Sequence, residues 1–191
     1  MANSRLEAGY HEITYTLVYP GVLASMLYDL YQLVTGGEKY EHPGVMLLIT
    51  LTYLLDYFHL FVDLKKLHRF PILYCSLDLL IAVLFGMAFA YAKIDNLRKA
   101  EFSIVASFML MLLYSAFEVS EHRLAWKSYL KDRWIYPSLA ALGILQIFFH
   151  QRVAPNAYLF LISFLYIAYI FIGWKAETVP STHKRAHEEK H

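Results

Sequence analysis

Ionisable side chains interrupt long apolar segments in this chain, and this contradiction constrains the fold more than any other feature. Asp29, Asp56, His59, Asp78 and Glu118 each lie within runs made mostly of Leu, Ile, Val, Phe, Met and Ala. A charged group at the centre of a bilayer costs about 2.5–3.5 kcal/mol on insertion scales, so such residues normally face other helices or a hydrated cavity. The sequence therefore predicts a membrane protein with a polar interior.

The composition is typical of a membrane protein and argues against several other classes of protein. Hydrophobic residues make up 58% of the 191 residues, charged residues only 17%, and the mean hydropathy is +0.39. A net charge of +1 does not indicate a nucleic-acid-binding protein, because such proteins are usually strongly basic. The single cysteine, Cys75, excludes a disulfide framework and a cysteine metal site. Since no phosphate-binding glycine loop or HExxH pair is present, we expect no bound cofactor.

Six apolar segments are candidates for membrane-spanning helices, because about 20 apolar residues are needed to cross the hydrocarbon core. They cover residues 13–35, 43–63, 70–94, 102–119, 134–149 and 154–174. The fifth is the shortest and could instead lie tilted or at the interface. The predicted fold is all-α, a polytopic transmembrane helical bundle of about six spans, with four or five also possible. The bundle occupies residues 1–177 and a polar cytoplasmic tail occupies residues 178–191.

The distribution of basic residues predicts the orientation of such a bundle. With six spans, the 17 Lys and Arg residues divide twelve against five between the two faces. Because cytoplasmic loops carry the excess of Lys and Arg, both termini are predicted to be cytoplasmic. We expect a multi-pass integral protein of the plasma (inner) membrane.

The second segment carries a polar stripe. Thr52, Asp56, His59 and Asp63 are separated by four, three and four residues, which places them on one face of a helix. Carboxylates beside an imidazole suit proton relay or cation coordination. The alternative is that Asp56 and His59 form a hydrogen-bonded pair with a purely structural role.

In the third segment, Asp78 lies on the same line as three small residues. Ala82, Gly86 and Ala90 follow it at four-residue spacing. A ridge of small residues lets another helix approach closely, so Asp78 should point into the bundle. Two roles explain Asp78 equally well. It forms an interhelical hydrogen bond that sets the register of two helices, or it takes part in transport.

Several of these residues are expected at a similar depth in the bilayer. Counted from the predicted cytoplasmic ends, Asp56, His59, Asp78 and Glu118 all fall in the inner half of the bilayer. Asp29 falls in the outer third, where His150 and Gln146 of the fifth segment approach the same side. Together these groups predict an ion or proton pathway. Glu118 and Asp56, with a histidine one turn away from each, leave the question of a bound metal open. Interfacial, hydrated positions are the alternative for Asp29 and His150.

The tyrosines predict no site. Tyr40 and Tyr91 lie near predicted interfaces, where aromatic side chains form belts. Tyr158, Tyr166 and Tyr169 in the last segment are interpreted as facing lipid or packing between subunits.

Three functions fit these residues. The first is a small channel or transporter subunit, expected to be a homo-oligomer, with a proton- or cation-linked acidic and histidine cluster. The second is a membrane sensor or anchor that docks a cytosolic protein through residues 121–133 or the C-terminal tail. The third is an intramembrane enzyme acting on lipid or isoprenoid, so enzymatic activity stays undecided.

Overall fold

The computed structural model describes residues 9–10, 12–64, 72–122, 135–149 and 154–178. All regular structure in these ranges is helical, which confirms the prediction of an all-α chain. The elements are η1 (Ile13–Val18, a π-helix), α2 (Tyr19–Val34), α3 (Pro43–Leu64), α4 (Ile72–Lys93), α5 (Leu97–His122), α7 (Ile135–Phe149) and α8 (Pro155–Thr178). Each of the six predicted segments overlaps one of these α-helices, and α3, α5 and α8 extend beyond the predicted ends.

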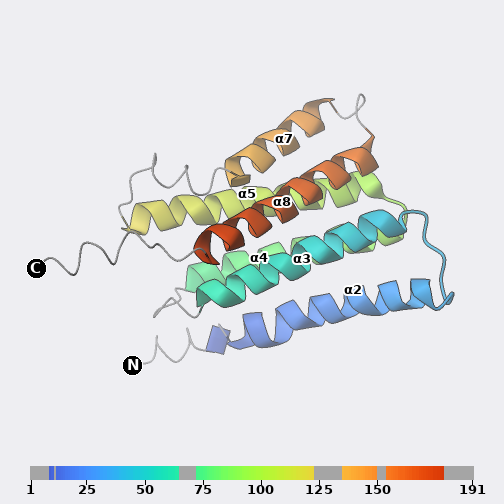
Figure 1. Cartoon of the computed structure of the whole chain (residues 1–191), viewed down its shortest axis with the longest axis horizontal. Helices are drawn as coiled ribbons and strands as arrows, with labels where there is room; N and C mark the ends of the chain where they lie inside the picture. The colour runs from blue at the N-terminus through green and yellow to red at the C-terminus, as the bar shows by residue number, and fades with distance from the viewer. Residues whose placement is uncertain (1–8, 11, 65–71, 123–134, 150–153, 179–191) are drawn as a thin grey trace, which may run out of the picture.

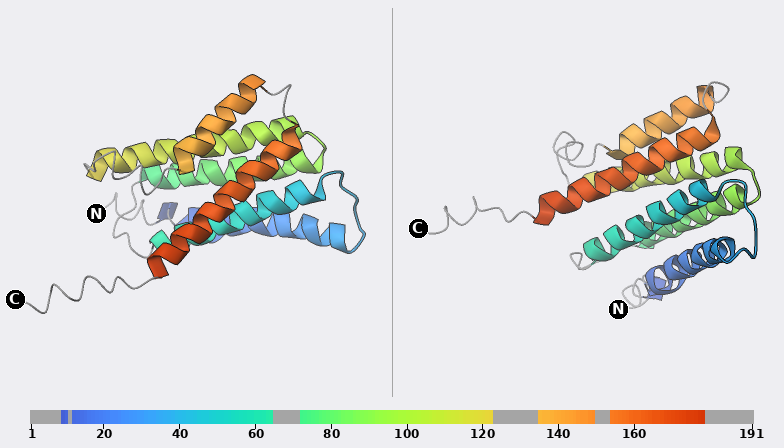
Figure 2. Two further views of the ribbon diagram at one scale, coloured as in Figure 1. Left: turned by 45° about the horizontal axis from the view of Figure 1, so that its top comes forward. Right: turned by 45° about the vertical axis from the view of Figure 1, so that its right-hand side comes forward.

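The helices run side by side as a bundle (Figure 1). α4 packs against α3 and α5, and α2 covers α3 and α4. α8 lies against α3, α5 and α7, while α7 also contacts α5. α2 and α7 therefore lie on opposite sides of the bundle, as Figure 1 and both views of Figure 2 show.

Three helical segments within the described ranges are long and apolar enough to cross a membrane. They are Ile13–Val34, Ile72–Lys93 and Leu97–Phe117. The remaining helices contain shorter apolar stretches, Pro43–Phe58, Pro137–Gln146 and Pro155–Phe171. Length and composition thus support a membrane protein.

The outer surface of the bundle is apolar. On α4, the side chains of Leu80, Val83 and Met87 are 50%, 44% and 40% exposed. Large exposed apolar residues recur on α2, α3, α5, α7 and α8. Carboxylates lie inside instead: Asp78 and Glu101 are 2% and 4% exposed. A soluble protein rarely exposes such a continuous apolar surface while burying acids, and a bilayer would cover it.

Local signals in the sequence explain where the helices end. Gly36, with a φ of 75°, follows the end of α2 in the left-handed conformation that glycine adopts without cost. The turn between α4 and α5 contains Asp95, which has a φ of 58°. Asn96 then caps α5 by accepting a hydrogen bond from the Lys99 backbone N–H at 3.3 Å. This turn and the α2–α3 loop lie at the same end of the bundle (Figure 1).

The ridge of small residues on α4 is used within the chain. Ala82 is fully buried, and a Cβ atom on Gly86 would lie 3.4 Å from Val22 Cγ1 of α2. Ala90, at the end of the ridge, is exposed. The middle of the ridge therefore packs against α2 of the same chain.

Gly143 seats α7 against the bundle, and substituting it should destabilise the fold. A Cβ atom there would lie 2.8 Å from both Cγ atoms of Val105 and 3.1 Å from the Tyr158 hydroxyl. Because Val105 is β-branched and stiff, Gly143→Ala should cost about 1–3 kcal/mol of unfolding free energy. Unfolding of the purified protein by SDS in mixed micelles, followed by circular dichroism, measures this change.

Gly21→Ala is the matched control, because nothing lies within 4 Å of a Cβ atom at this helical position. It should leave stability unchanged or raise it by about 0.5–1 kcal/mol. Equal effects of the two substitutions would show that α7 does not pack on α5 through Gly143.

Candidate functional site: a buried carboxylate–tyrosine cluster

Asp78 is held inside the bundle by two tyrosines of the first helix, which consists of η1 and the α2 that follows it directly. The Tyr15 hydroxyl donates a hydrogen bond to Asp78 Oδ2, and the Tyr19 hydroxyl donates to the Asp78 backbone oxygen at 3.1 Å. Tyr15 is 3% exposed, Tyr19 is fully buried and Asp78 is 2% exposed. The side chain of Asp78 thus faces η1 and α2 rather than lipid.

Asp56 lies on α3, on the side that faces α8. It is 5% exposed, and its Oδ1 accepts a hydrogen bond of 2.5 Å from the Tyr166 hydroxyl. Tyr166 is fully buried and packs edge-on against Phe108 of α5, with ring centroids 5.5 Å apart. Among the described side chains, Asp56 Oδ2 has no hydrogen-bond partner. A buried carboxylate oxygen without a donor is costly unless it gains a proton or a cation.

Tyr19 links the two helices that carry the carboxylates, because its hydroxyl donates to α4 and its ring packs on α3. Its ring stacks on those of Tyr53 and Tyr57 of α3, with centroids 5.3 and 5.6 Å apart. Both Asp56 and Asp78 interact electrostatically with the Tyr19 hydroxyl, and Asp78 also interacts with Asp56. The two acids therefore belong to one cluster, which spans η1, α2, α3, α4 and α8.

A proline explains why Tyr57 of α3 donates a hydrogen bond to η1. In the π-helical turn, the Tyr19 N–H donates to the Thr14 oxygen, so the next bond of this pattern would join Pro20 to Tyr15. Pro20 has no N–H to donate. The Tyr57 hydroxyl donates to the Tyr15 backbone oxygen instead, at 3.2 Å. This contact fixes the register of the first helix against α3.

The structure brings together two of the predicted pathway residues, Asp56 and Asp78. His59 and Glu118 lie on α3 and α5, but their side chains are outside the described residues, as is the whole of His150. Whether these three join the cluster stays a prediction.

Asp29 belongs to a different part of the molecule. It binds Lys93 Nζ at 2.9 Å through Oδ1, which ties α2 to the end of α4. Gln146 lies on α7, on the opposite side of the bundle from α2. Asp29 and Gln146 therefore lie on opposite sides of the bundle, because residues at the same depth need not be on neighbouring helices.

The tyrosine partners were not predicted from the sequence. Tyr166 was interpreted as lipid-facing or as packing between subunits, and it is a buried donor to Asp56 instead. One signal was present: Tyr53 and Tyr57 lie on the helix of Asp56, one turn apart. Glu101 was placed outside the fourth segment, but it is buried on α5, which begins at Leu97.

Comparison with protein-family models, with curated proteins and with solved structures found no match to this chain. Inference about function therefore starts from the carboxylate–tyrosine cluster itself.

Proposed function

We propose that this chain is a small integral membrane transport protein in which Asp56 and Asp78 bind and release a proton. The proposal includes six membrane-spanning helices with both termini in the cytoplasm, which places the two acids in the inner half of the bilayer. Its main support is the buried Asp56 carboxylate, which has one oxygen bound by Tyr166 and the other without a donor among the described side chains.

The surroundings favour a proton over a metal cation as the ligand. Hard cations such as Ca²⁺ take several oxygen ligands. In the described part of the cluster, Asp78 Oδ2 and Asp56 Oδ1 already accept hydrogen bonds from phenol groups. A proton needs only one oxygen, and Asp56 Oδ2 offers it. Because a phenol hydroxyl both donates and accepts, Tyr166 and Tyr15 can stay bound to Asp56 and Asp78 in either protonation state of these acids.

A homo-oligomer forms part of this proposal. Six helices in one copy leave little room for a water-filled path, and both acids are nearly sealed from solvent. Since Gly86 already seats α2, copies would meet through other exposed apolar faces, such as that of Leu80 and Val83.

The sealed cluster also fits the sensor or anchor function, in which the acids bias the packing of the bundle without moving protons. The docking elements expected for it, residues 121–133 and the tail, lie almost entirely outside the described residues. An intramembrane enzyme fits less well, because 5% and 2% exposure of Asp56 and Asp78 leaves no surface for a lipid substrate to reach them.

Proton movement by the purified protein separates these functions. The full chain is reconstituted in liposomes loaded with a pH-sensitive dye, and a pH gradient is imposed with and without opposing Na⁺ or K⁺ gradients. We expect the internal pH to relax faster than in protein-free liposomes under at least one gradient. Relaxation equal to that of protein-free liposomes under every gradient would contradict transport and favour the sensor function.

A further inference from the structure

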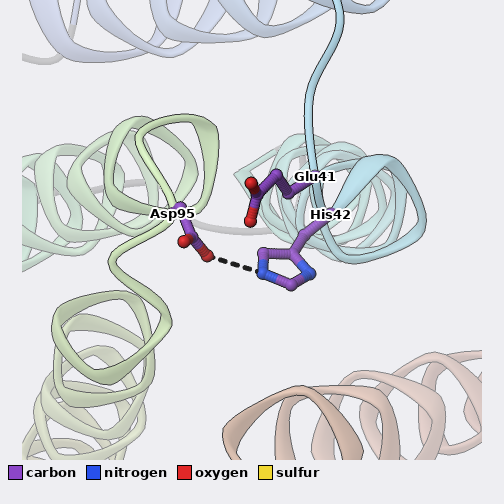
Figure 3. Close-up of side chains that lie close together, drawn as sticks. All are labelled: Glu41, His42 and Asp95. Atoms are coloured by element: carbon purple, nitrogen blue, oxygen red, sulfur yellow. Dashed lines mark hydrogen bonds and ion pairs between the residues drawn. The ribbon is translucent and has the colours of Figure 1, made fainter.

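Three metal-ligating side chains meet at the other end of the bundle. Glu41 and His42 end the α2–α3 loop, and Asp95 lies in the α4–α5 turn (Figure 3). One ligand atom from each lies within 4.8 Å of the others. The closest pair is His42 Nε2 and Asp95 Oδ1, 2.7 Å apart. The helical rise places this group about 20 Å along α3 from Asp56.

Helix ends hold these residues in place. His42 precedes Pro43, which begins α3, and its backbone oxygen accepts the Met46 N–H at 3.1 Å. Asp95 is held between two fixed neighbours, because the Ile94 N–H donates to the Ala90 oxygen at 3.3 Å and the Asn96 N–H donates to the Tyr91 oxygen at 2.8 Å. The ligands are therefore presented by the ends of three helices.

Lys93, at the end of α4, does not balance the charge of this group. Two carboxylates and one imidazole approach one another here, and the imidazole alone does not offset both acids at neutral pH. Lys93 is engaged elsewhere, since its Nζ lies 2.9 Å from Asp29 and 3.7 Å from Glu38. The ion pair joins His42 and Asp95, and the Glu41 carboxylate lies beside it.

We propose that Glu41, His42 and Asp95 bind a divalent transition metal ion, with Zn²⁺ as the best fit. Zn²⁺ takes imidazole nitrogen and carboxylate oxygen at about 2.0–2.2 Å, so tetrahedral ligand atoms lie about 3.3 Å apart. Reaching that spacing requires His42 and Asp95 to separate slightly and Glu41 to approach, which exposed side chains can do by rotation.

A hollow beside the group leaves room for a fourth ligand. It has a volume of about 300 Å³ and is lined by both loop ligands and the start of α8, including Asn156 and Phe160. Three protein ligands with one open position is the arrangement of sites that bind water or an exogenous ligand. The bound ion would join the α2–α3 loop to the α4–α5 turn. This proposal is independent of the proton-transport proposal.

Zn²⁺ binding to the purified full chain tests the site. Competition with a fluorescent Zn²⁺ chelator at neutral pH should show one tight site in the wild type. His42→Ala and Asp95→Asn should each weaken it by about 100-fold, because even outer-shell changes at metal sites cost 10–100-fold. Glu41→Gln should weaken it as well. X-ray absorption at the zinc edge should show imidazole and oxygen ligands.

Histidines in the tail provide the control, because His183, His187 and His191 could bind Zn²⁺ by themselves. The triple variant His183→Ala, His187→Ala and His191→Ala should keep the tight site. The proposal is overturned if that variant loses the site, if folded His42→Ala and Asp95→Asn proteins keep wild-type affinity, or if the wild type binds no Zn²⁺. Circular dichroism establishes that each variant is folded.

Discussion

Asp56→Asn should lower proton flux through the reconstituted protein by about 100-fold, at the low end of what a positioned acid–base group contributes. Asparagine keeps the shape of the side chain and an oxygen for Tyr166, but it cannot gain or lose a proton. The fold should therefore persist while proton transfer at this position is lost. The dye assay in liposomes gives the rate, and circular dichroism gives the helix content.

Two control variants make this prediction specific. Tyr166→Phe removes the donor to Asp56 but keeps the carboxylate, so it should slow the flux less than Asp56→Asn does. Asp29→Asn replaces an acid that is bound to Lys93 outside the cluster, and it should leave the flux near the wild-type rate. Wild-type flux in folded Asp56→Asn protein would remove Asp56 from the transport mechanism.

Tyr19→Ala should cost about 3–5 kcal/mol of unfolding free energy, because it empties a large, fully buried site. The ring stacks on tyrosines from α3, so its loss loosens the first helix from the rest of the bundle. Tyr19→Phe keeps the ring and loses only the hydrogen bond to Asp78, which should cost about 1 kcal/mol. Unfolding by SDS in mixed micelles measures both changes.

Tyr28→Ala is the control on the same helix, since Tyr28 is 62% exposed. It should change the free energy of unfolding little. If Tyr19→Ala and Tyr28→Ala destabilise the protein equally, the tyrosine stack around Tyr19 does not hold the first helix in place.

The helices were predictable because their signal is local. Runs of apolar residues, and proline at the start of α3 and α8, lie in consecutive positions of the sequence. Asn96 also offered a helix-start signal, which would have placed Glu101 inside α5. The predicted membrane segment begins at residue 102, five residues after α5 begins at Leu97, and Arg98 and Lys99 in between are charged.

The cluster itself was predictable only in part. Four-residue spacing placed Asp78 toward other helices, and counting residues placed Asp56 at the same depth. Their partners depend on which helices are neighbours, and spacing along one helix carries no information about that. Tyr15 lies 63 residues from Asp78, and Tyr166 lies 110 residues from Asp56. Tyrosine is common at membrane interfaces as well as in buried positions, so the residue type alone did not indicate that these side chains are buried.

Infrared difference spectroscopy of the reconstituted protein tests most directly whether Asp56 and Asp78 bind a proton inside the bundle. The account predicts a carboxylic acid C=O band that grows as the pH is lowered, loses one component in Asp56→Asn and another in Asp78→Asn, and shifts in its remaining component in each variant because the two acids interact. An identical band in the wild type and both variants, or no such band at any pH at which the protein stays folded, would contradict it.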